Sequence, residues 1–317
     1  MSLQIRRRAD DSYAAHSDKP AYYGKNIVKP HVWTPMIPTY FAIGGMAGAS
    51  ATLGWLARLR GNRQLARAGF RTAFAGAAVS GVLLVADLGV PKRFLNMLRM
   101  FKPTSPMSMG TWIIQAVGAG ATVAVASEVF GDAIPPALVR SSEAIAGLFG
   151  LPMAVYTAVL IADTATPSWF EARNHLPFLF MAGAASSAGA ANTLLSGERS
   201  GRSARFLAIA GGALEIAMHH RMTQALGSLG DPYRQGKAHR LSRAATACTA
   251  GGCALLALCS KAAPARVAGS LLLLAGAVLE RFCVLEAGSE SARNPRYVLA
   301  QQHDQGAFNG TALKTTV

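Results

Sequence analysis

The stretch "LPFLFMAGAASSAGAANTLLSG", residues Leu176–Gly197, contains no Asp, Glu, Lys or Arg. Roughly twenty apolar residues are enough to cross the hydrocarbon core of a bilayer as an α-helix. Three further stretches lack these charges in the same way: Pro38–Ala57, Ser108–Ser127 and Ala144–Ala162. These four segments predict an integral membrane protein built from helices.

Four more apolar stretches carry few charged residues. They are Thr72–Val90 with Asp87, Ser203–Leu226 with Glu215, the short Ala244–Ser260, and Ala265–Ala287 with Glu280, Arg281 and Glu286. All eight stretches together predict an all-α integral membrane protein with eight transmembrane helices, arranged as two four-helix bundles. The membrane domain is expected over residues 35–287, between a polar N-terminal tail (1–34) and a C-terminal tail (288–317).

The overall composition agrees with a lipid environment. Hydrophobic residues make up 51% of the chain and charged residues only 15%, against about 25% charged residues in an average soluble domain. The formal charge of +15 could indicate nucleic-acid binding, but most of the 31 basic residues lie in the tails and loops, as in other membrane proteins. Nucleic acid is therefore not an expected partner. No cleavable signal peptide is expected, because "MSLQIRRRADDSYAAHSDKP" has no apolar stretch after its arginines.

The distribution of basic residues gives a topology. Because eight is an even number, both termini are predicted on one side of a bacterial inner membrane. More Lys and Arg residues lie on the side of the tails, so the positive-inside rule predicts that the termini are cytoplasmic. The stretch "RLRGNRQLARAGFR", Arg58–Arg71, weakens this prediction because it places five arginines on the opposite face.

The cysteines and histidines do not indicate a metal centre. Four cysteines lie in the last two predicted helices without a C-x-x-C spacing, so no disulfide, zinc or iron–sulfur site is expected. His219 and His220 are adjacent in a predicted helix, so their side chains diverge by about 100° and are poorly placed for haem. We therefore expect no haem and no metal in this chain. Clusters of small residues such as "GGMAG" predict close packing between helices.

Polar residues gather where the predicted helices end on the tail side. The candidates are Asp87, Asp163, His31, Trp33, Trp112, Trp169 and His175. A charged side chain within a membrane segment is costly unless it is paired or hydrated, so it is a functional candidate. Equally, Asp87 and Asp163 could be carboxylates at helix ends, paired with Arg93 or Arg173.

Two polar residues lie deeper in the predicted helices. Tyr156 lies about two turns before Asp163, and Glu215 lies near the middle of the sixth helix. Both suit a quinone site, where a carbonyl accepts a hydrogen bond from Tyr or His and a carboxyl takes up protons. Tyr156 could instead form a hydrogen bond between helices, and Glu215 suits a proton path or a buried polar network better than the pocket itself.

Three stretches resemble the NrfD/PsrC family, the polysulfide reductase-type quinone-interacting membrane subunits. They are "WTPMIPTYFAIGGMAGAS", the loop "DLGVPKRFLNMLRMFKPTSPMSMGTW" and "YTAVLIADTATPSWFEARNHLPFLF". The resemblance implies a haem-free anchor that exchanges electrons between menaquinone or ubiquinone and a ferredoxin-like iron–sulfur subunit. That subunit would serve a molybdenum or tungsten catalytic subunit, so this chain would hold no catalytic centre for the other substrate.

The resemblance also assigns residues. Tyr156 matches the family's quinone-site tyrosine, His31 is the best match to its histidine near the first helix, and Asp87 occupies its acidic position at the head of the loop. Ala158 replaces a usual glycine, which suggests a narrower site.

The loop itself is expected to form a wall of the quinone pocket and part of a docking face for the iron–sulfur partner. Its basic residues, with no acid among them, could steer an acidic ferredoxin-like domain; they are Lys92, Arg93, Arg99 and Lys102. They could equally anchor the loop to lipid phosphates. Pro103 and Pro106 would fix the loop backbone, and Ser105 or Ser108 could cap the next helix.

The favoured hypothesis is a redox anchor, in which Tyr156 and His31 hydrogen-bond the quinone and Asp87 or Asp163 relays protons. The alternative is an ion or proton transporter that uses intramembrane carboxylates: Glu215, Glu128, Glu143 and Glu280. No broken helix pair or inverted repeat is evident to support it. A purely structural anchor, which would tolerate loss of Tyr156, is a third hypothesis.

Overall fold

The computed structural model describes residues 28, 29, 31 and 33–299. Within these residues all regular secondary structure is helical, and no strand is present. The long helices are α2 (Met36–Leu59), α3 (Arg63–Asp87), α5 (Pro106–Phe130), α6 (Pro136–Ala162), α8 (Leu176–Leu195), α9 (Arg202–Ala225), α11 (Gly236–Leu258) and α12 (Ala263–Arg293). Each of them overlaps one of the predicted apolar segments, although α3 and α11 begin earlier than predicted, at Arg63 and Gly236. The all-helical architecture is thus confirmed.

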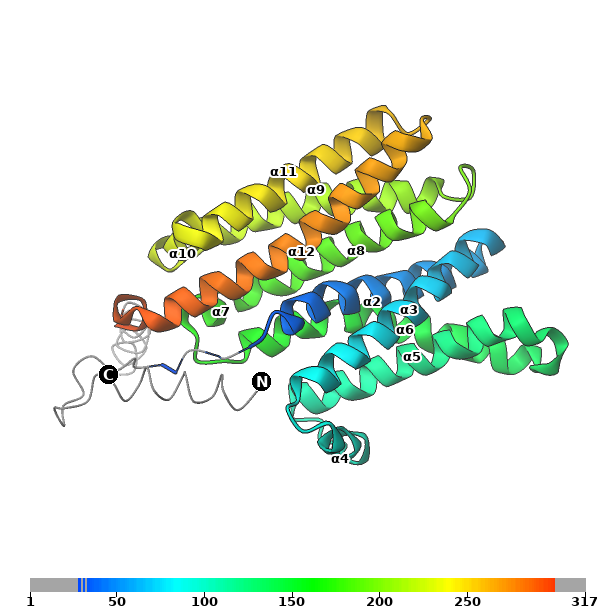
Figure 1. The fold of residues 1–317 in the computed structure, drawn as a ribbon, viewed down its shortest axis with the longest axis horizontal. Coiled ribbons are helices and arrows are strands. Elements are labelled where there is room, and N and C mark those ends of the chain that lie inside the picture. Colours follow the sequence, from blue (N-terminus) through cyan, green and yellow to red (C-terminus); the bar gives the residue numbers. More distant parts are fainter. Residues whose placement is uncertain (1–27, 30, 32, 300–317) are drawn as a thin grey trace, which may run out of the picture.

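Short helical segments connect the long helices. They are η1 (Pro91–Arg93), α4 (Phe94–Arg99), η2 (Gly131–Ala133), α7 (Pro167–Glu171), η3 (Ala172–Asn174), η4 (Gly227–Gly230) and α10 (Asp231–Arg234). Figure 1 shows that α4, α7 and α10 all lie at the end of the molecule where the described chain begins and ends.

Six of the long helices are long and apolar enough to cross a membrane: α3, α5 with η2, α6, α8, α11 and α12. The other two, α2 and α9, fall short by composition. Helix α9 carries Glu215, His219 and Arg221, whereas α2 is rich in glycine and alanine. More than half of the residues of α2 are buried by neighbouring helices, so this helix needs less apolar side-chain surface than one that faces lipid.

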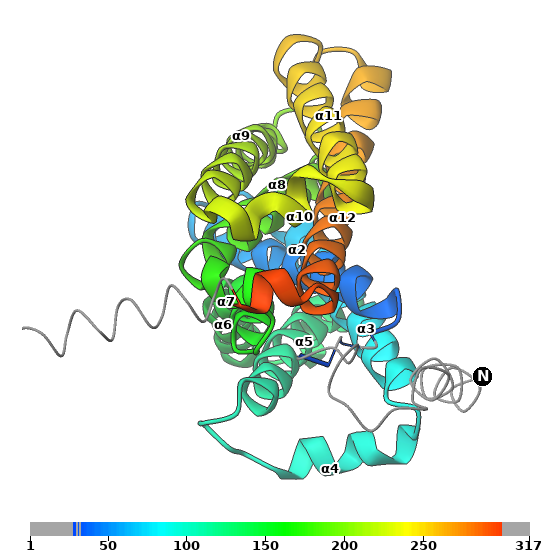
Figure 2. The same ribbon diagram turned by 90° about the vertical axis from the view of Figure 1, so that its left-hand side faces the viewer.

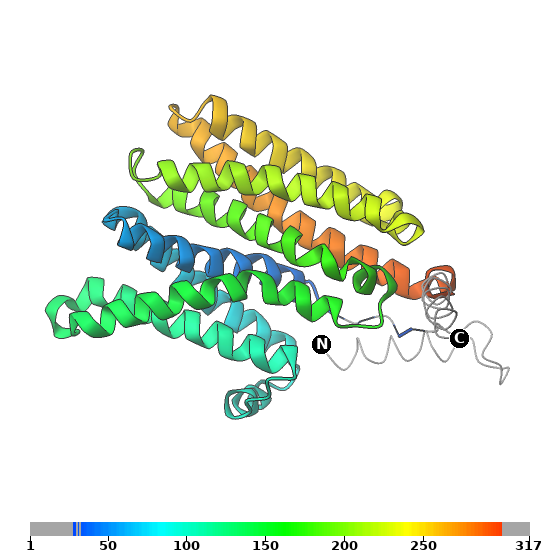
Figure 3. The same cartoon turned by 180° about the vertical axis from the view of Figure 1, so that it is seen from behind.

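The long helices pack in two groups that follow chain order. Helices α2, α3, α5 and α6 contact one another, and so do α8, α9, α11 and α12 (Figures 1 and 3). The groups meet where α2 contacts α8 and α12 and where α6 and α3 contact α8. Seen along the helices, α2 lies inside the molecule and α4 lies at its periphery (Figure 2).

Small residues set the spacing between these helices, as the glycine and alanine clusters predict. A Cβ atom at Gly48 of α2 would lie only 2.5 Å from the carbonyl oxygen of Gly150 in α6. Gly54 and Gly69 bring α2 and α3 together in the same way, since a Cβ atom on Gly69 would lie 2.6 Å from the Cα atom of Gly54. Such close approach of helix backbones supplies much of the packing energy in lipid.

The beginning and end of the described chain lie side by side. His31 Nε2 hydrogen-bonds Ser289 Oγ of α12 at 2.9 Å, which places both at one end of the molecule. Helix α12 continues past the expected domain boundary at Ala287 to Arg293, and its Gly288 lies against the Trp169 ring, where a Cβ atom would overlap the ring. Most of the two predicted tails, residues 1–27 and 300–317, lies outside the described residues.

Candidate functional site

A cavity of about 370 Å³ lies between α2, α3, α5 and α6, with α4 beside it. Its walls are largely apolar and extend from Phe94 and Met97 of α4 to Thr122 of α5. A small number of polar side chains line it: Trp33, Tyr40, Asp87, Thr111, Gln115, Thr122 and Tyr156. An apolar cavity with a few convergent polar groups is the usual form of a small-molecule site. Three of the predicted site residues, Trp33, Asp87 and Tyr156, therefore meet in one place.

The Tyr156 ring packs against the backbone of α5 at Gly110. A Cβ atom at Gly110 would overlap the ring, with the Cδ2 and Cζ atoms of Tyr156 each only 2.8 Å away. Gly110 is the glycine that closes the "SPMSMG" motif, so the motif provides the space that the tyrosine occupies. Within the described part of the chain the Tyr156 hydroxyl makes no hydrogen bond, so the expected alternative, a bond to another helix, is not seen there.

Sequence reasoning missed four of the polar residues that line the cavity: Tyr40, Thr111, Gln115 and Thr122. Tyr40 is only 2% exposed, and its hydroxyl has no hydrogen-bond partner among the described residues. The side-chain nitrogen of Gln115 is likewise buried and unpartnered within residues 33–299. Tyr40 lies in the stretch "WTPMIPTYFAIGGMAGAS", and Gln115 is an amide within an otherwise apolar helix. Both features could have indicated the site.

Asp87 ends α3 at the edge of the cavity. Its Oδ1 atom accepts a hydrogen bond of 2.6 Å from Thr34 Oγ1, just before α2. Its expected partner Arg93 forms no ion pair with it in the described structure. The alternative of an Asp87–Arg93 ion pair is therefore not found among the described residues; Gly89, with a positive φ of 69°, lies between the two.

Asp163 lies outside the cavity. It is exposed at the C-terminal end of α6, and its backbone N–H donates to the carbonyl of Val159. Arg173, its expected partner, lies 4.5 Å over the Phe170 ring and 3.9 Å from Glu171 instead. Asp163 is therefore not among the residues that could touch a ligand in the cavity.

His31 belongs to an aromatic cluster behind the cavity wall. Its ring centroid lies 4.9 Å from that of Trp33 and 4.6 Å from that of Trp169, and the two tryptophans stack at 5.6 Å. Trp33 lines the cavity, but His31 does not. Burial and the charge of Arg293 lower the pKa of His31 from 6.5 to about 4, so the imidazole is neutral at pH 7.

The remaining aromatic candidates, Trp169, Trp112 and His175, do not line the cavity. Trp169 is 1% exposed, and its Nε1 atom donates to the carbonyl of Val284 in α12 at 2.8 Å. Trp112 Nε1 donates to the carbonyl of Met100 at 3.1 Å and so attaches the loop to α5. His175 begins α8 and does not line the cavity. Ala158 is fully buried and does not line it either.

The loop between α3 and α5 is held by its serines. Ser105 caps α5 by accepting from the backbone N–H of Ser108, as predicted, and Ser108 Oγ bonds Lys102 N at 3.0 Å and Met100 O at 3.1 Å. The predicted docking residues Lys92, Arg93, Arg99 and Lys102 are all exposed. None of these four forms an ion pair with another residue that the structure describes.

A second polar cluster occupies the other group of helices. Glu215 of α9 lies 3.9 Å from Arg281 of α12, whose Nη2 atom donates to the carbonyl of Phe180 at 2.9 Å. His219 Nδ1 contacts Glu280 at 2.8 Å, and its Nε2 contacts Ser242 Oγ at 2.9 Å. Glu215 therefore belongs to a buried polar network and does not line the cavity.

The two other acidic candidates are engaged in ion pairs at the opposite end of the molecule. Arg58 Nε donates to Glu143 at 3.0 Å, and Arg71 pairs with Glu128. Among the described residues no group of three His, Cys, Asp or Glu side chains could hold a metal ion.

Comparison with known proteins addresses the same part of the chain. The family model described as polysulphide reductase, NrfD, matches residues 25–211, which include every residue that lines the cavity. No curated protein matches the chain. The family match covers more than half of the sequence and confirms the resemblance inferred from the loop. With its membrane-length helices, this chain is a multi-pass membrane protein that belongs to the polysulphide reductase NrfD family.

Proposed function

We propose that this chain is the haem-free membrane anchor of a respiratory oxidoreductase complex. It exchanges electrons between a quinone pool and a ferredoxin-like iron–sulfur subunit, which serves a molybdenum or tungsten catalytic subunit. The observation that carries the proposal is the cavity in which Tyr156, Asp87 and Trp33 meet beside the loop of the family motif. All eight long helices cross a bacterial inner membrane as two four-helix bundles, with both termini cytoplasmic.

The cavity suits a quinone head group. Such a group is a flat apolar ring with two carbonyl acceptors, and the cavity offers apolar walls with donors that have no hydrogen-bond partner among the described residues. Those donors are the hydroxyl of Tyr40 and the amide of Gln115, both buried, and the hydroxyl of Tyr156. Burying a donor without a partner costs roughly 1 to 3 kcal/mol, which a bound acceptor would offset. Bound menaquinone or ubiquinone would supply two-electron, two-proton redox chemistry.

The surrounding residues hold the ligand and move protons. Tyr156 donates a hydrogen bond to a carbonyl oxygen, and Gly110 keeps its ring in place. Asp87, oriented by Thr34 at the edge of the cavity, exchanges protons between the site and solvent. Trp33 closes one wall, and His31 positions Trp33 from behind.

The exposed basic loop provides the docking face for the iron–sulfur subunit. Because its side chains carry no acidic partner among the described residues, the loop presents uncompensated positive charge beside the cavity. Complementary charge of this kind raises association rates between proteins. Phe94 and Met97 of the same segment line the cavity, so a docked cluster would lie near the quinone.

An ion or proton transporter is the second candidate, favoured by the buried network of α9, α11 and α12. His219 contacts both Ser242 and Glu280. Arg281, the next residue after Glu280, forms an ion pair with Glu215. Glu128 and Glu143 do not support this function, because each is neutralised by an arginine. The two candidate functions can also be combined: quinone chemistry in the cavity would then drive proton movement through Glu215.

A tyrosine pair tests the first proposal. The complex is purified in mild detergent, its bound quinone and partner subunits are identified by mass spectrometry, and quinol-dependent cluster reduction is measured. Tyr156→Phe is expected to lower that rate about a hundredfold, because a donor in contact with the reacting carbonyl is lost. Tyr233→Phe is the matched control, since its hydroxyl is also buried and unpartnered within the described chain but lies in α10. Equal rates in both variants would contradict a quinone site at Tyr156.

A further inference from the structure

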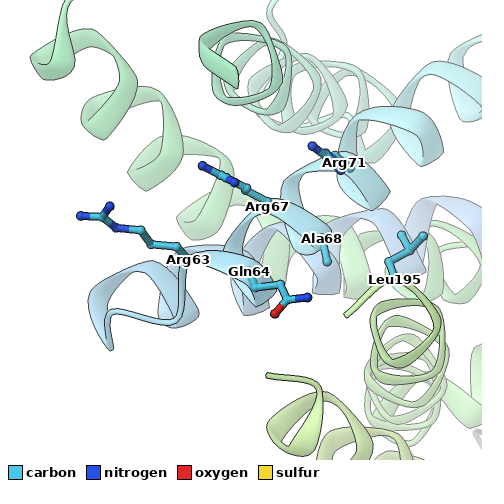
Figure 4. Close-up of a pocket in the computed structure, with 6 residues that line it drawn as sticks. All are labelled: Arg63, Gln64, Arg67, Ala68, Arg71 and Leu195. Atoms are coloured by element: carbon cyan, nitrogen blue, oxygen red, sulfur yellow. The ribbon is translucent and has the colours of Figure 1, made fainter. Parts of the chain in front are cut away.

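A second cavity, of about 490 Å³, lies at the opposite end of the molecule, where the chain turns from α2 into α3. It is lined by Arg63, Gln64, Arg67, Ala68, Arg71 and Leu195. Figure 4 shows the three arginine side chains leaving α3 toward one side and Gln64, Ala68 and Leu195 on the other. The cavity therefore has a cationic side and a less polar side.

The charge of the cavity is positive. Arg71 is neutralised by Glu128, but Arg63 and Arg67 form no ion pair with any residue that the structure describes. The two are four residues apart on one helix, so their guanidinium groups share a face. A guanidinium group presents a planar fork of donors that matches the oxygens of a phosphate. The cavity therefore favours a phosphate-type anion.

The wall beside the arginines is built from contacts between distant segments. Ser200, between α8 and α9, donates from its hydroxyl to Gln64 Oε1 at 2.8 Å. Its carbonyl accepts from Asn62 Nδ2 at 3.1 Å, and Asn62 Oδ1 also caps α3 through the N–H of Leu65. These contacts hold the loop after α8 against the start of α3.

The surface next to the arginines is apolar. Continuing along the same stripe of α3, the exposed residues are Ala75, Val79 and Val82, and Val82 is 69% exposed. Leu195 on α8 is 58% exposed beside the cavity. A ligand with an anionic head and hydrocarbon chains would satisfy both surfaces, whereas a free anion would use only the arginines.

Membrane topology does not account for these arginines. The stretch Arg58–Arg71 lies on the face opposite to the chain ends, where the positive-inside rule disfavours basic residues if the termini are cytoplasmic. An anionic ligand bound by these arginines explains their presence there.

We propose that this cavity binds the phosphate of an anionic phospholipid. Arg63 and Arg67 contact the phosphate, and the apolar stripe of α3 contacts the acyl chains. The site is separate from the quinone cavity, and the proposal does not depend on the redox function.

Native mass spectrometry of the delipidated protein tests this proposal. The protein is titrated with phosphatidylglycerol, with phosphatidylcholine as the neutral lipid, and with inorganic phosphate as the soluble anion. Each arginine near an anionic lipid contributes about fivefold in affinity, so Arg63→Gln/Arg67→Gln is expected to weaken phosphatidylglycerol binding about 25-fold. The single variants, expected to lose about fivefold each, provide the same test if the double variant does not fold.

The matched control is Arg240→Gln/Arg243→Gln, which removes the same charge from two exposed arginines of α11. It should bind phosphatidylglycerol like the parent protein. The proposal is overturned if the cavity variants and the control bind this lipid equally, or if phosphatidylcholine binds as tightly. Displacement of the lipid by millimolar inorganic phosphate would overturn it too, since the cavity would then be a site for free anions.

Discussion

The two groups of helices differ in what their buried polar side chains face. In α9, α11 and α12, the polar side chains face one another: His219 contacts both Glu280 and Ser242, and Arg281 faces Glu215. In α2, α5 and α6, the hydroxyls of Tyr40 and Tyr156 and the amide of Gln115 face a cavity. Arg281 and Glu215 carry opposite charges that compensate one another at 3.9 Å, although both Glu215 carboxylate oxygens and the Nε and Nη1 atoms of Arg281 form no hydrogen bond within the described residues. The neutral donors of Tyr40, Tyr156 and Gln115 instead face a cavity, where they are available to a ligand.

The physical basis of this difference is the cost of an unsatisfied polar group in an apolar medium. Arg281 offsets that cost by donating to the Phe180 carbonyl, with its guanidinium carbon 3.8 Å above the Phe180 ring. Gly183 makes this possible, because a Cβ atom there would lie 2.9 Å from Arg281 Nη2. Nothing comparable serves Tyr40, whose hydroxyl stays unpartnered in the described structure. The comparison therefore predicts a structural role for one cluster and ligand binding for the other.

Replacement of Arg281 should have the largest effect. Arg281→Met leaves Glu215 and Glu280 buried with less compensating charge, and breaking a buried ion pair typically costs about 3 to 5 kcal/mol. We expect a clearly lower unfolding temperature in detergent. Arg240→Met, at an exposed position of α11, is the control and should unfold like the parent protein. An unchanged unfolding temperature for Arg281→Met would contradict the structural role of this polar cluster.

Closing the space under Tyr156 should have the next largest effect. Gly110→Ala places a methyl group inside the volume of the tyrosine ring, and overpacking of this kind costs about 1 to 3 kcal/mol. The ring must move, so we expect quinone affinity, measured by titration of the purified protein, to fall about tenfold, which corresponds to about 1.4 kcal/mol.

Gly118→Ala is the matched control for that variant. Gly118 lines the same cavity from the same helix, but a Cβ atom there would meet only the Ala77 Cβ atom at 3.7 Å, an ordinary contact. Equal quinone affinity in the two variants would show that the position of the Tyr156 ring is not important for binding.

His31 predicts a smaller, pH-dependent effect on stability. Its pKa is about 4 in the folded protein and 6.5 in the unfolded chain, so the unfolded chain binds more protons between these values. The stabilisation by neutral His31 is present above pH 6.5 and is lost as the pH falls toward 4. Thermal unfolding measured across this range should show the loss in the parent protein and a weaker dependence in His31→Gln. Parallel curves for the two proteins would contradict the burial of a neutral imidazole.

The basic loop predicts the smallest effect. Exposed charges at the edge of an interface change association rates more than affinity, so Arg99→Gln/Lys102→Gln should slow binding of the iron–sulfur subunit several-fold at low salt. The difference should vanish at high ionic strength, because salt screens exposed charges. Quinone affinity of the isolated subunit should not change. A loss that persists at high salt would indicate direct contacts and not electrostatic steering.

Local features of the sequence predicted the helices and part of the cavity. Charge-free runs such as Leu176–Gly197 identify membrane-length helices, because apolar composition is a property of the segment itself. Ser105 was identified as a helix cap for the same reason, since its partner Ser108 is three residues away. Asp87 and Tyr156 could be assigned to the candidate site because the family motif places them beside the loop.

The partners of buried polar groups were decided only by the tertiary structure. Whether Tyr40 faces the cavity, whether His31 lies behind Trp33, and whether Asp87 meets Thr34 or Arg93 all depend on how each helix is rotated about its axis. That rotation follows from close contacts between small residues on different helices, such as Gly48 with Gly150 and Gly54 with Gly69. Apolar composition determines that a helix forms in the membrane, but packing against its neighbours determines which of its side chains meet.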